Sequence, residues 1–156
     1  MVVLGSRWRA LWRASARFIV AAACVVPAHV SAATLEIPVE LKAAQKASQL
    51  RQPTIAIGIL QPLVARYPKI ADYTSWLLAT SQFDAERYAD APKTLEPVFA
   101  QSPASPLIWR AALLAAKAYQ QSGNAHAAVE ILRQHYAKLP QPQGDLAMAT
   151  AFAEIG

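Results

Sequence analysis

The chain has 156 residues, which is enough for one domain, and its 15 basic and 10 acidic residues give a formal net charge of +5. Four of the basic residues lie between Arg7 and Arg17, while every acidic residue lies at Glu36 or later, so the body of the chain is nearly neutral. The body contains no basic patch with interleaved aromatic residues, which argues against a nucleic-acid partner.

Residues 1–33 have the features of a secretory signal peptide. A basic segment precedes the apolar stretch Phe18–Val26, and small residues follow at Val30–Ala33. Cleavage after Ala32 and cleavage after Ala33 both fit. The apolar stretch is shorter than the about 20 residues that a membrane-spanning helix needs. We therefore expect export to the periplasm, with membrane contact only through the signal peptide; an uncleaved membrane anchor is the alternative.

Cys24 is the only cysteine, and it lies inside the apolar stretch. Lipidation of Cys24 is an alternative to a cleaved signal peptide, but Ala21 stands where bacterial lipid-attachment motifs usually have a larger residue such as leucine. If Cys24 leaves with the signal peptide, the mature chain has no thiol for a disulfide or a metal.

Three segments in residues 34–156 share one pattern of anchors. Each has an alanine, a leucine four residues later, and a proline eight residues after the leucine. The anchors are Ala56, Leu60 and Pro68, then Ala91, Leu95 and Pro103, then Ala128, Leu132 and Pro140. Successive copies lie 35 and 37 residues apart, a period typical of helical repeat arrays.

The physical chemistry of these anchors fits the second helix of a helix-turn-helix pair. An alanine and a leucine four residues apart share one helix face, where the small alanine lets a neighbouring helix approach. The proline cannot continue the helix, so it marks the end. The sequence therefore predicts an all-α solenoid of about six to seven helices, with repeats at about 39–68, 69–103 and 104–140 and a partial helix at 143–156.

The first half of the array has clear helix boundaries. A helix with a mostly alanine face is expected over Val39–Arg51, and Pro53 suits the first turn of the next helix. The third helix spans Ile70–Phe83. Asp90 is then expected to cap the fourth helix, which places Pro92 in the tolerated first turn.

The second half contains the most apolar helix, Pro106–Gln121, which is expected to be buried on several sides. After it, Gly123 should take a left-handed conformation and Asn124 should cap the sixth helix. The seventh helix, Asp145–Ile155, has an apolar face made of Leu146, Ala149, Phe152, Ala153 and Ile155. Repeat arrays need a terminal helix with a polar outer side, so if the chain is a fragment of a longer array, we expect this segment to be frayed or self-associating.

Pro62 and Pro97 occupy the same position of the first two copies, inside a predicted helix. An interior proline costs about 3 kcal/mol unless the helix bends around it. These two prolines are expected either to cause tolerated kinks on a solvent-exposed helix face or to produce the curvature of the array.

The anchor pattern resembles tetratricopeptide (TPR) repeats. Over Pro53–Pro140, the segments LQPLVARYP, LEPVFAQSP, ADYTSWLLA and SPLIWRAALLAAKAYQQSGNAHAAVEILRQHYAKLP also resemble the N-terminal superhelical region of bacterial soluble lytic transglycosylases. The resemblance implies a TPR-like periplasmic scaffold, with the rest of a longer transglycosylase chain, and peptidoglycan, as partners. Two features depart from it: the copies are spaced more widely than the about 34 residues of TPR units, and His135 stands where Leu63 and Val98 stand in the earlier copies.

The catalytic motif of that family has no counterpart in this sequence. The family cleaves peptidoglycan with a C-terminal lysozyme-like domain whose catalytic Glu is followed by Ser, and no Glu here precedes Ser. We therefore assign no catalytic residue and expect no glycan cleavage by this chain alone, which would be a fragment or a version without the catalytic domain. The alternative function is a stand-alone periplasmic TPR adaptor that binds a protein or peptide partner in cell-envelope maintenance.

No cofactor or metal site is predicted. His126 and His135 have no cysteine or acidic partner at ligand spacing, and none of the five glycines belongs to a phosphate-binding loop. The carboxylates of Asp84, Glu86 and Asp90 fit a solvated turn.

Trp76 and Trp109 are the candidate groove residues, because they lie near the beginning of successive first helices. They could line a groove that stacks on a glycan. Aromatic residues at helical spacing more often belong to a core, which is the alternative for both.

Overall fold

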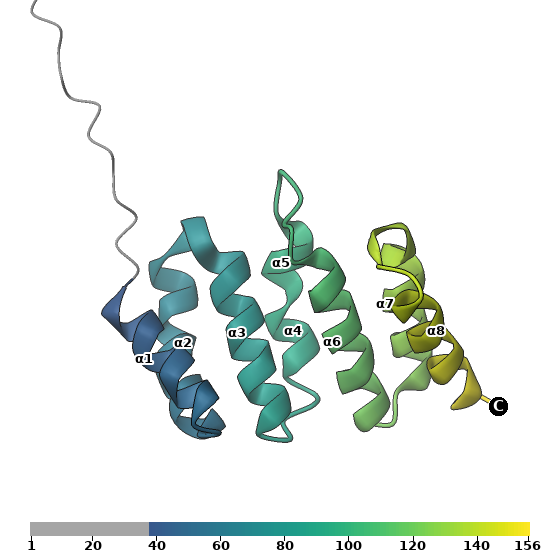
Figure 1. Ribbon diagram of the computed structural model, residues 1–156, viewed down its shortest axis with the longest axis horizontal. Coiled ribbons are helices and arrows are strands. Elements are labelled where there is room, and N and C mark those ends of the chain that lie inside the picture. Colours follow the sequence, from purple (N-terminus) through teal and green to yellow (C-terminus); the bar gives the residue numbers. More distant parts are fainter. Residues whose placement is uncertain (1–37) are drawn as a thin grey trace, which may run out of the picture. The chain divides into compact units, whose positions relative to one another are not determined.

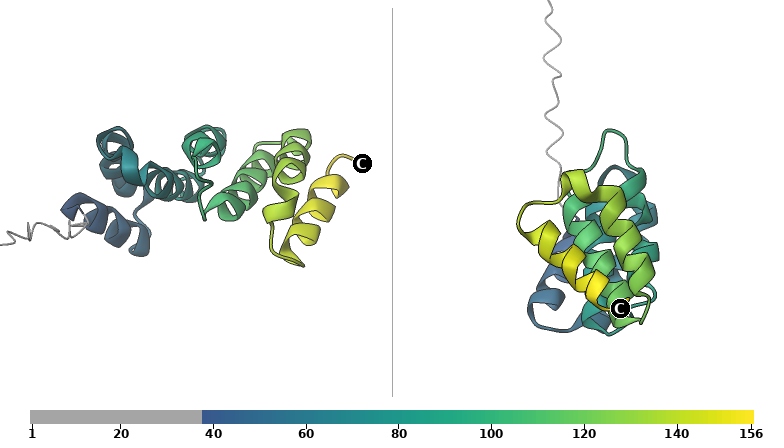
Figure 2. Two further views of the ribbon diagram at one scale, coloured as in Figure 1. Left: turned by 90° about the horizontal axis from the view of Figure 1, so that it is seen from above. Right: turned by 90° about the vertical axis from the view of Figure 1, so that its right-hand side faces the viewer.

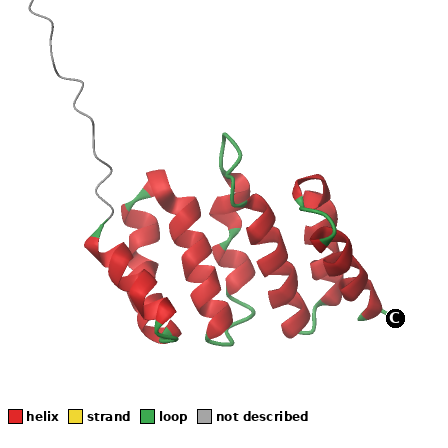
Figure 3. Cartoon of the chain, viewed as in Figure 1, coloured by secondary structure: helices red, strands yellow, loops and turns green. Residues whose placement is uncertain are grey.

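The computed structural model describes residues 38–156, and the predicted signal peptide lies outside them (Figure 1). The prediction of an all-α chain is confirmed, since the described residues form helices joined by turns and contain no β-strand (Figure 3).

The predicted helix boundaries agree with the observed ones to within two residues at most ends. The first four α-helical segments are α1 (Val39–Gln49), α2 (Pro53–Arg66), α3 (Ala71–Asp84) and α4 (Ala91–Thr94). They are followed by α5 (Glu96–Ala100), α6 (Ile108–Gln121), α7 (Ala125–His135) and α8 (Gln143–Ala153). Short 3-10 helices cover Pro68–Ile70 and Tyr136–Lys138.

The helices of residues 38–156 lie in two rows (Figure 2). We call α1, α3, α6 and α8 the first helices, and α2, the α4–α5 pair and α7 the second helices. Each first helix packs against the second helices beside it in the chain, and α1 contacts α3, α3 contacts α6 and α6 contacts α8. Seen from above in Figure 2, α1 and α8 lie farther from the second row than α3 and α6, so the outer face of the first helices curves inward at α3 and α6.

Three hydrophobic clusters follow one another along the rows. The first lies between α1, α2 and α3, the second between α3, α4, α5 and α6, and the third between α6, α7 and α8. Helix α3 contributes Leu78 to the first cluster and Ala79 to the second, while α6 contributes Ala111 to the second and Ala112 to the third. Helix α6 is therefore buried on more than one side, as expected, because it lies between two cores.

The alanine and leucine anchors of all three copies lie in these cores. Each of the six has an exposed fraction of 0%: Ala56, Leu60, Ala91, Leu95, Ala128 and Leu132. The three anchor prolines follow the ends of α2, α5 and α7, as expected from their inability to continue a helix.

Pro62 and Pro97 differ in their effect on the second helices. Pro62 is exposed inside α2, which continues past it without a break. The helix containing Pro97 is instead divided at Leu95, so the prediction that both prolines lie in a helix interior is wrong for Pro97. Pro97 has no N–H to donate to the carbonyl one turn earlier, so the hydrogen bond that would continue α4 into α5 is missing.

The two predicted helix caps have different outcomes. The side chain of Asn124 accepts a hydrogen bond from the backbone N–H of Ala127 at 3.2 Å, which confirms its capping role. Asp90 stands at the N-cap position of α4 but does not cap it. Arg87 donates to its carboxylate instead, with Nε at 2.9 Å and Nη2 at 2.7 Å.

The predicted apolar face of α8 is mostly exposed. Leu146 has an exposed fraction of 70% and Phe152 one of 49%. The side of α8 that packs on the third cluster is formed by Ala147, Met148 and Ala151, because these residues point toward α6 and α7. The sequence pattern therefore identified the solvent-facing apolar side of this helix.

The three turns from a first helix to a second helix share one backbone conformation. Each has a residue with positive φ: Arg51 at 54°, Glu86 at 61° and Gly123 at 77°. The residue after it donates its N–H to the carbonyl five residues earlier, at 2.8 to 2.9 Å, which is the Schellman arrangement. These donor and acceptor pairs are Gln52 and Ala47, Arg87 and Gln82, and Asn124 and Tyr119. The positive-φ residues lie 35 and 37 residues apart, the same spacings as the anchors.

This shared turn predicts opposite effects for two substitutions. Gly123→Ala should lower the free energy of unfolding by about 1 kcal/mol, because a side chain disfavours the left-handed conformation. No atom lies within 4 Å of where the new Cβ would be, so crowding would not contribute. Glu86→Gly should raise the free energy of unfolding, by less, since glycine also loses more chain entropy on folding.

Urea denaturation of the two variants and of Ala85→Gly tests this account. Ala85 precedes Glu86 with an ordinary φ of −89°, so glycine there should only destabilise. A loss of stability in Glu86→Gly equal to that in Ala85→Gly would show that the left-handed turn carries no strain.

Candidate functional site

Two adjoining cavities open on the outer face of the first helices. The one between α3 and α6 has a volume of about 300 Å³, and the one between α6 and α8 has a volume of about 420 Å³. Leu113 and Lys117 of α6 line both, so the cavities form one continuous depression, which we call the first-helix groove.

A row of contacting side chains runs from α1 through α3 to α6, and its members Trp76, Arg110 and Trp109 line the groove. Gln45 of α1 donates a hydrogen bond to the hydroxyl of Tyr73 at 2.6 Å, and the rings of Tyr73 and Trp76 stack with centroids 6.2 Å apart. The guanidinium carbon of Arg110 lies 5.8 Å from the centroid of Trp76 and 5.0 Å from that of Trp109. A cation over an aromatic face gains about 0.5–1 kcal/mol at an exposed site, so the two indoles orient the guanidinium group.

The structure brings the two predicted groove residues together. Trp76 and Trp109 are both half-buried and line the same cavity between α3 and α6. Trp76 also packs against the second hydrophobic cluster and Trp109 against the third. Each indole thus packs against a core and also lines the groove, while stacking on a glycan stays a prediction.

The groove is positively charged. Arg110 and Lys117 are exposed, and neither takes part in a salt bridge within residues 38–156. No Asp or Glu lines either cavity of the groove. The remaining lining is apolar or amide and hydroxyl side chains, including Leu114, Leu146 and Thr150. Such a surface favours a ligand that is apolar with negative charges.

Equivalent positions of the second and third copies provide part of the lining. The left-handed turn residues that follow α3 and α6, Glu86 and Gly123, are 37 residues apart. The same shift aligns Trp76 of α3 with Leu113 of α6, and Thr80 with Lys117. All four of these residues line the cavity between α3 and α6. Sequence reasoning missed Arg110 and Lys117 as groove residues. The 37-residue spacing of the turns could have found Lys117, because it aligns Lys117 with Thr80, which lines the same cavity.

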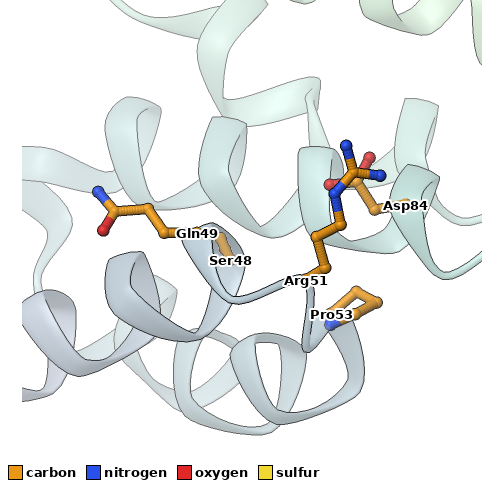
Figure 4. Close-up of a pocket in the computed structure, with 5 residues that line it drawn as sticks. All are labelled: Ser48, Gln49, Arg51, Pro53 and Asp84. Carbon is orange, nitrogen blue, oxygen red and sulfur yellow. The ribbon is translucent and has the colours of Figure 1, made fainter.

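A separate polar cavity of about 500 Å³ lies where the turn after α1 meets the end of α3 (Figure 4). It is lined by Ser48, Gln49, Arg51, Pro53 and Asp84. Figure 4 shows the Arg51 side chain extending toward Asp84, so the cavity has one charge of each sign. These charges offset one another, and the cavity lacks the aromatic lining of the first-helix groove.

The other residues singled out from the sequence do not gather into a site. Asp84 and Glu86 are exposed, and Asp90 pairs with Arg87. His126 is exposed on α7. Within residues 38–156, no group of three His, Cys, Asp or Glu side chains is arranged to hold a metal ion.

His135 lies at the contact between two second helices. Its imidazole stacks on Phe99 of α5, with ring centroids 4.7 Å apart and an interplanar angle of 14°. Its Nε2 is buried without a hydrogen-bond partner in the described part of the chain. Burial lowers the pKa of His135, because it disfavours the charged ring. Leu63 and Val98, at the same position of the earlier copies, are fully buried apolar residues.

None of the helices in residues 38–156 combines the length and the apolar character that crossing a bilayer requires. No known protein family model, curated protein or solved structure matches this chain.

The His135 contact predicts a pH dependence of stability. A histidine whose pKa is lowered by folding stabilises the protein fully above its unfolded pKa of about 6.5, and this stabilisation is lost as the pH falls below that value. Urea midpoints measured from about pH 7.5 down to pH 5 should therefore fall more in the wild type than in His135→Leu. His126→Gln is the matched control, since His126 is exposed and should leave the wild-type pH dependence intact. Identical pH profiles for the wild type and His135→Leu would contradict the role of His135.

Proposed function

We propose that this chain is a TPR-like helical-repeat scaffold whose first-helix groove binds a segment of a partner protein. The observation that carries the proposal is the pair of adjoining cavities lined by aromatic, apolar and basic side chains. The lining contains two cations without a salt-bridge partner in residues 38–156. Aromatic residues and arginine are the side chains most enriched at protein interfaces, where they contribute most of the binding energy.

Two spacings support the repeat-array part of the proposal. The sequence anchors and the left-handed turns recur with the same separations of 35 and 37 residues, although they lie in different parts of each copy. Each first helix also contacts the next first helix in the chain, as expected for stacked helix pairs that bury a continuous core. A stacked array leaves one face of its first helices free for a ligand.

The cellular context of the proposal comes from the sequence. The features of residues 1–33 favour export through a cleaved signal peptide, so we place the scaffold in the periplasm. A partner would then be another periplasmic protein or a further part of the same envelope assembly.

A second candidate is the non-catalytic scaffold of a lytic transglycosylase-like protein that contacts peptidoglycan. Two observations favour it. The segments between Pro53 and Pro140 resemble the superhelical region of that family. Trp76 and Trp109 also line one cavity, where indole faces could stack on sugar rings. The apolar lining at Leu113, Leu114 and Leu146 favours the protein-binding function, because sugar rings present mainly hydroxyl groups, whereas a protein segment can supply apolar side chains.

Site-specific photo-crosslinking in cells that produce the chain tests the proposal. A photoreactive amino acid at Gln143, which lines the groove on α8, should form adducts with a discrete protein identifiable by mass spectrometry. The same group at Gln61, an exposed position on α2 in the second row, is the control and should form no such adduct. Equal adducts at both positions, or none at Gln143, would contradict a protein-binding groove.

Incubation of the purified chain with isolated peptidoglycan separates the two candidates. A protein-binding scaffold should neither sediment with the peptidoglycan nor release anhydro-muropeptides from it. Sedimentation that is lost in Trp109→Ala would favour the transglycosylase-like scaffold instead.

A further inference from the structure

The two groove cations have a fixed spacing along α6. Arg110 and Lys117 are seven residues apart, which corresponds to about two helical turns, or about 10 Å along the helix axis. Both line the cavity between α3 and α6. They therefore point to the same side of the helix, as residues two turns apart do.

An apolar strip separates these cations. Leu113 and Leu114 follow Arg110 by three and four residues, are half-buried, and line the same cavity. Helix α6 thus presents a cation, an apolar pair and a second cation in succession. Trp76 extends the apolar strip on the α3 side, and Leu146 extends it on the α8 side.

The spacing of the cations distinguishes between partner conformations. Residues i and i+7 of a helix lie on one face about 10 Å apart along its axis, which equals the rise from Arg110 to Lys117 along α6. On an extended strand, residues on one side recur about every 7 Å, so no pair lies at about 10 Å. A helical segment with carboxylates at i and i+7 and apolar residues at i+3 and i+4 matches both charges and the strip between them.

The two cations would hold the carboxylates differently. The planar guanidinium of Arg110 lies between two indole rings, and a guanidinium group can donate two parallel hydrogen bonds to one carboxylate. Lys117 offers a compact point charge on a flexible stem. Arg110 is therefore the more directional of the two contacts.

We propose that the first-helix groove binds an amphipathic helix of its partner that carries Asp or Glu at positions i and i+7 and large apolar residues at i+3 and i+4. The identity of this ligand rests on the proposed function of the groove as a protein-binding site.

The test uses the purified full chain and a fluorescein-labelled, Ala-rich helical peptide of about 18 residues, long enough to form a helix. The peptide has Glu at i and i+7 and Leu at i+3 and i+4, and binding is measured by fluorescence anisotropy. Replacing either Glu by Gln should weaken binding about tenfold, the effect of losing one charge-assisted hydrogen bond. Moving the second Glu from i+7 to i+5, which turns it to another side of the helix, should weaken binding to a similar degree.

Variants of the chain provide matched controls. Arg110→Gln and Lys117→Gln should each weaken binding of the Glu peptide about tenfold. Arg110→Lys, which keeps the charge and loses the planar group, should fall between Arg110→Gln and the wild type. Lys93→Gln removes an exposed cation from α4 in the second row and should leave binding unchanged.

A charge exchange gives the sharpest result. The double variant Arg110→Glu with Lys117→Glu should no longer bind the Glu peptide. It should instead bind a peptide with Lys at i and i+7. Far-UV circular dichroism of the double variant would show that its helices are intact. Failure of the exchange in a folded double variant, or an equal effect of Lys93→Gln and Lys117→Gln, would overturn the proposal.

The two levels of the proposal fail in different ways. If Gln143 crosslinks a partner protein while the Glu peptide binds no more tightly than its Gln version, the acidic helix is wrong and the protein-binding groove stands. If neither the crosslink nor peptide binding is observed, both are wrong.

Discussion

The arrangement of this protein depends on two helices, α3 and α6, that each pack into two cores at once. Neighbouring residues of one helix point in different directions, so Ala111 enters the second cluster and Ala112 the third. Alanine suits these positions because it lets helices approach closely from both sides. With two sides buried, α3 and α6 keep only one strip free, and that strip is the floor of the first-helix groove.

The same packing explains where apolar side chains are exposed. The large exposed apolar residues among residues 38–156 all lie toward the two ends of the rows: Val39, Leu50, Ile55, Tyr136, Leu146, Phe152 and Ile155. Helices α1 and α8 each have a neighbouring first helix on one side only, whereas α3 and α6 have one on both sides. Exposure of apolar surface thus follows position in the row.

Charged side chains are also arranged differently in the groove and on the rest of the described surface. The described salt bridges join exposed residues away from the groove, where solvent makes such pairs weak contributors to stability. In the groove, Arg110 is oriented by aromatic rings instead of by a carboxylate. An arginine held in this way keeps its charge available to a ligand, and this electrostatic feature, together with the two cavities, distinguishes the groove from the rest of the surface.

The sequence by itself determined most helix boundaries and the turn at Gly123, because these depend on contacts within one or two turns of the chain. It also identified the three alanine and leucine anchor pairs, whose burial follows from packing between helices. It indicated Trp76 and Trp109 as a pair but did not identify Arg110 between them. Only the tertiary structure decided that contact, since it depends on how closely α3 approaches α6. The left-handed turns at Arg51 and Glu86 likewise emerge only from the structure, because neither residue type favours that conformation on its own and the sequence therefore carries no signal for it.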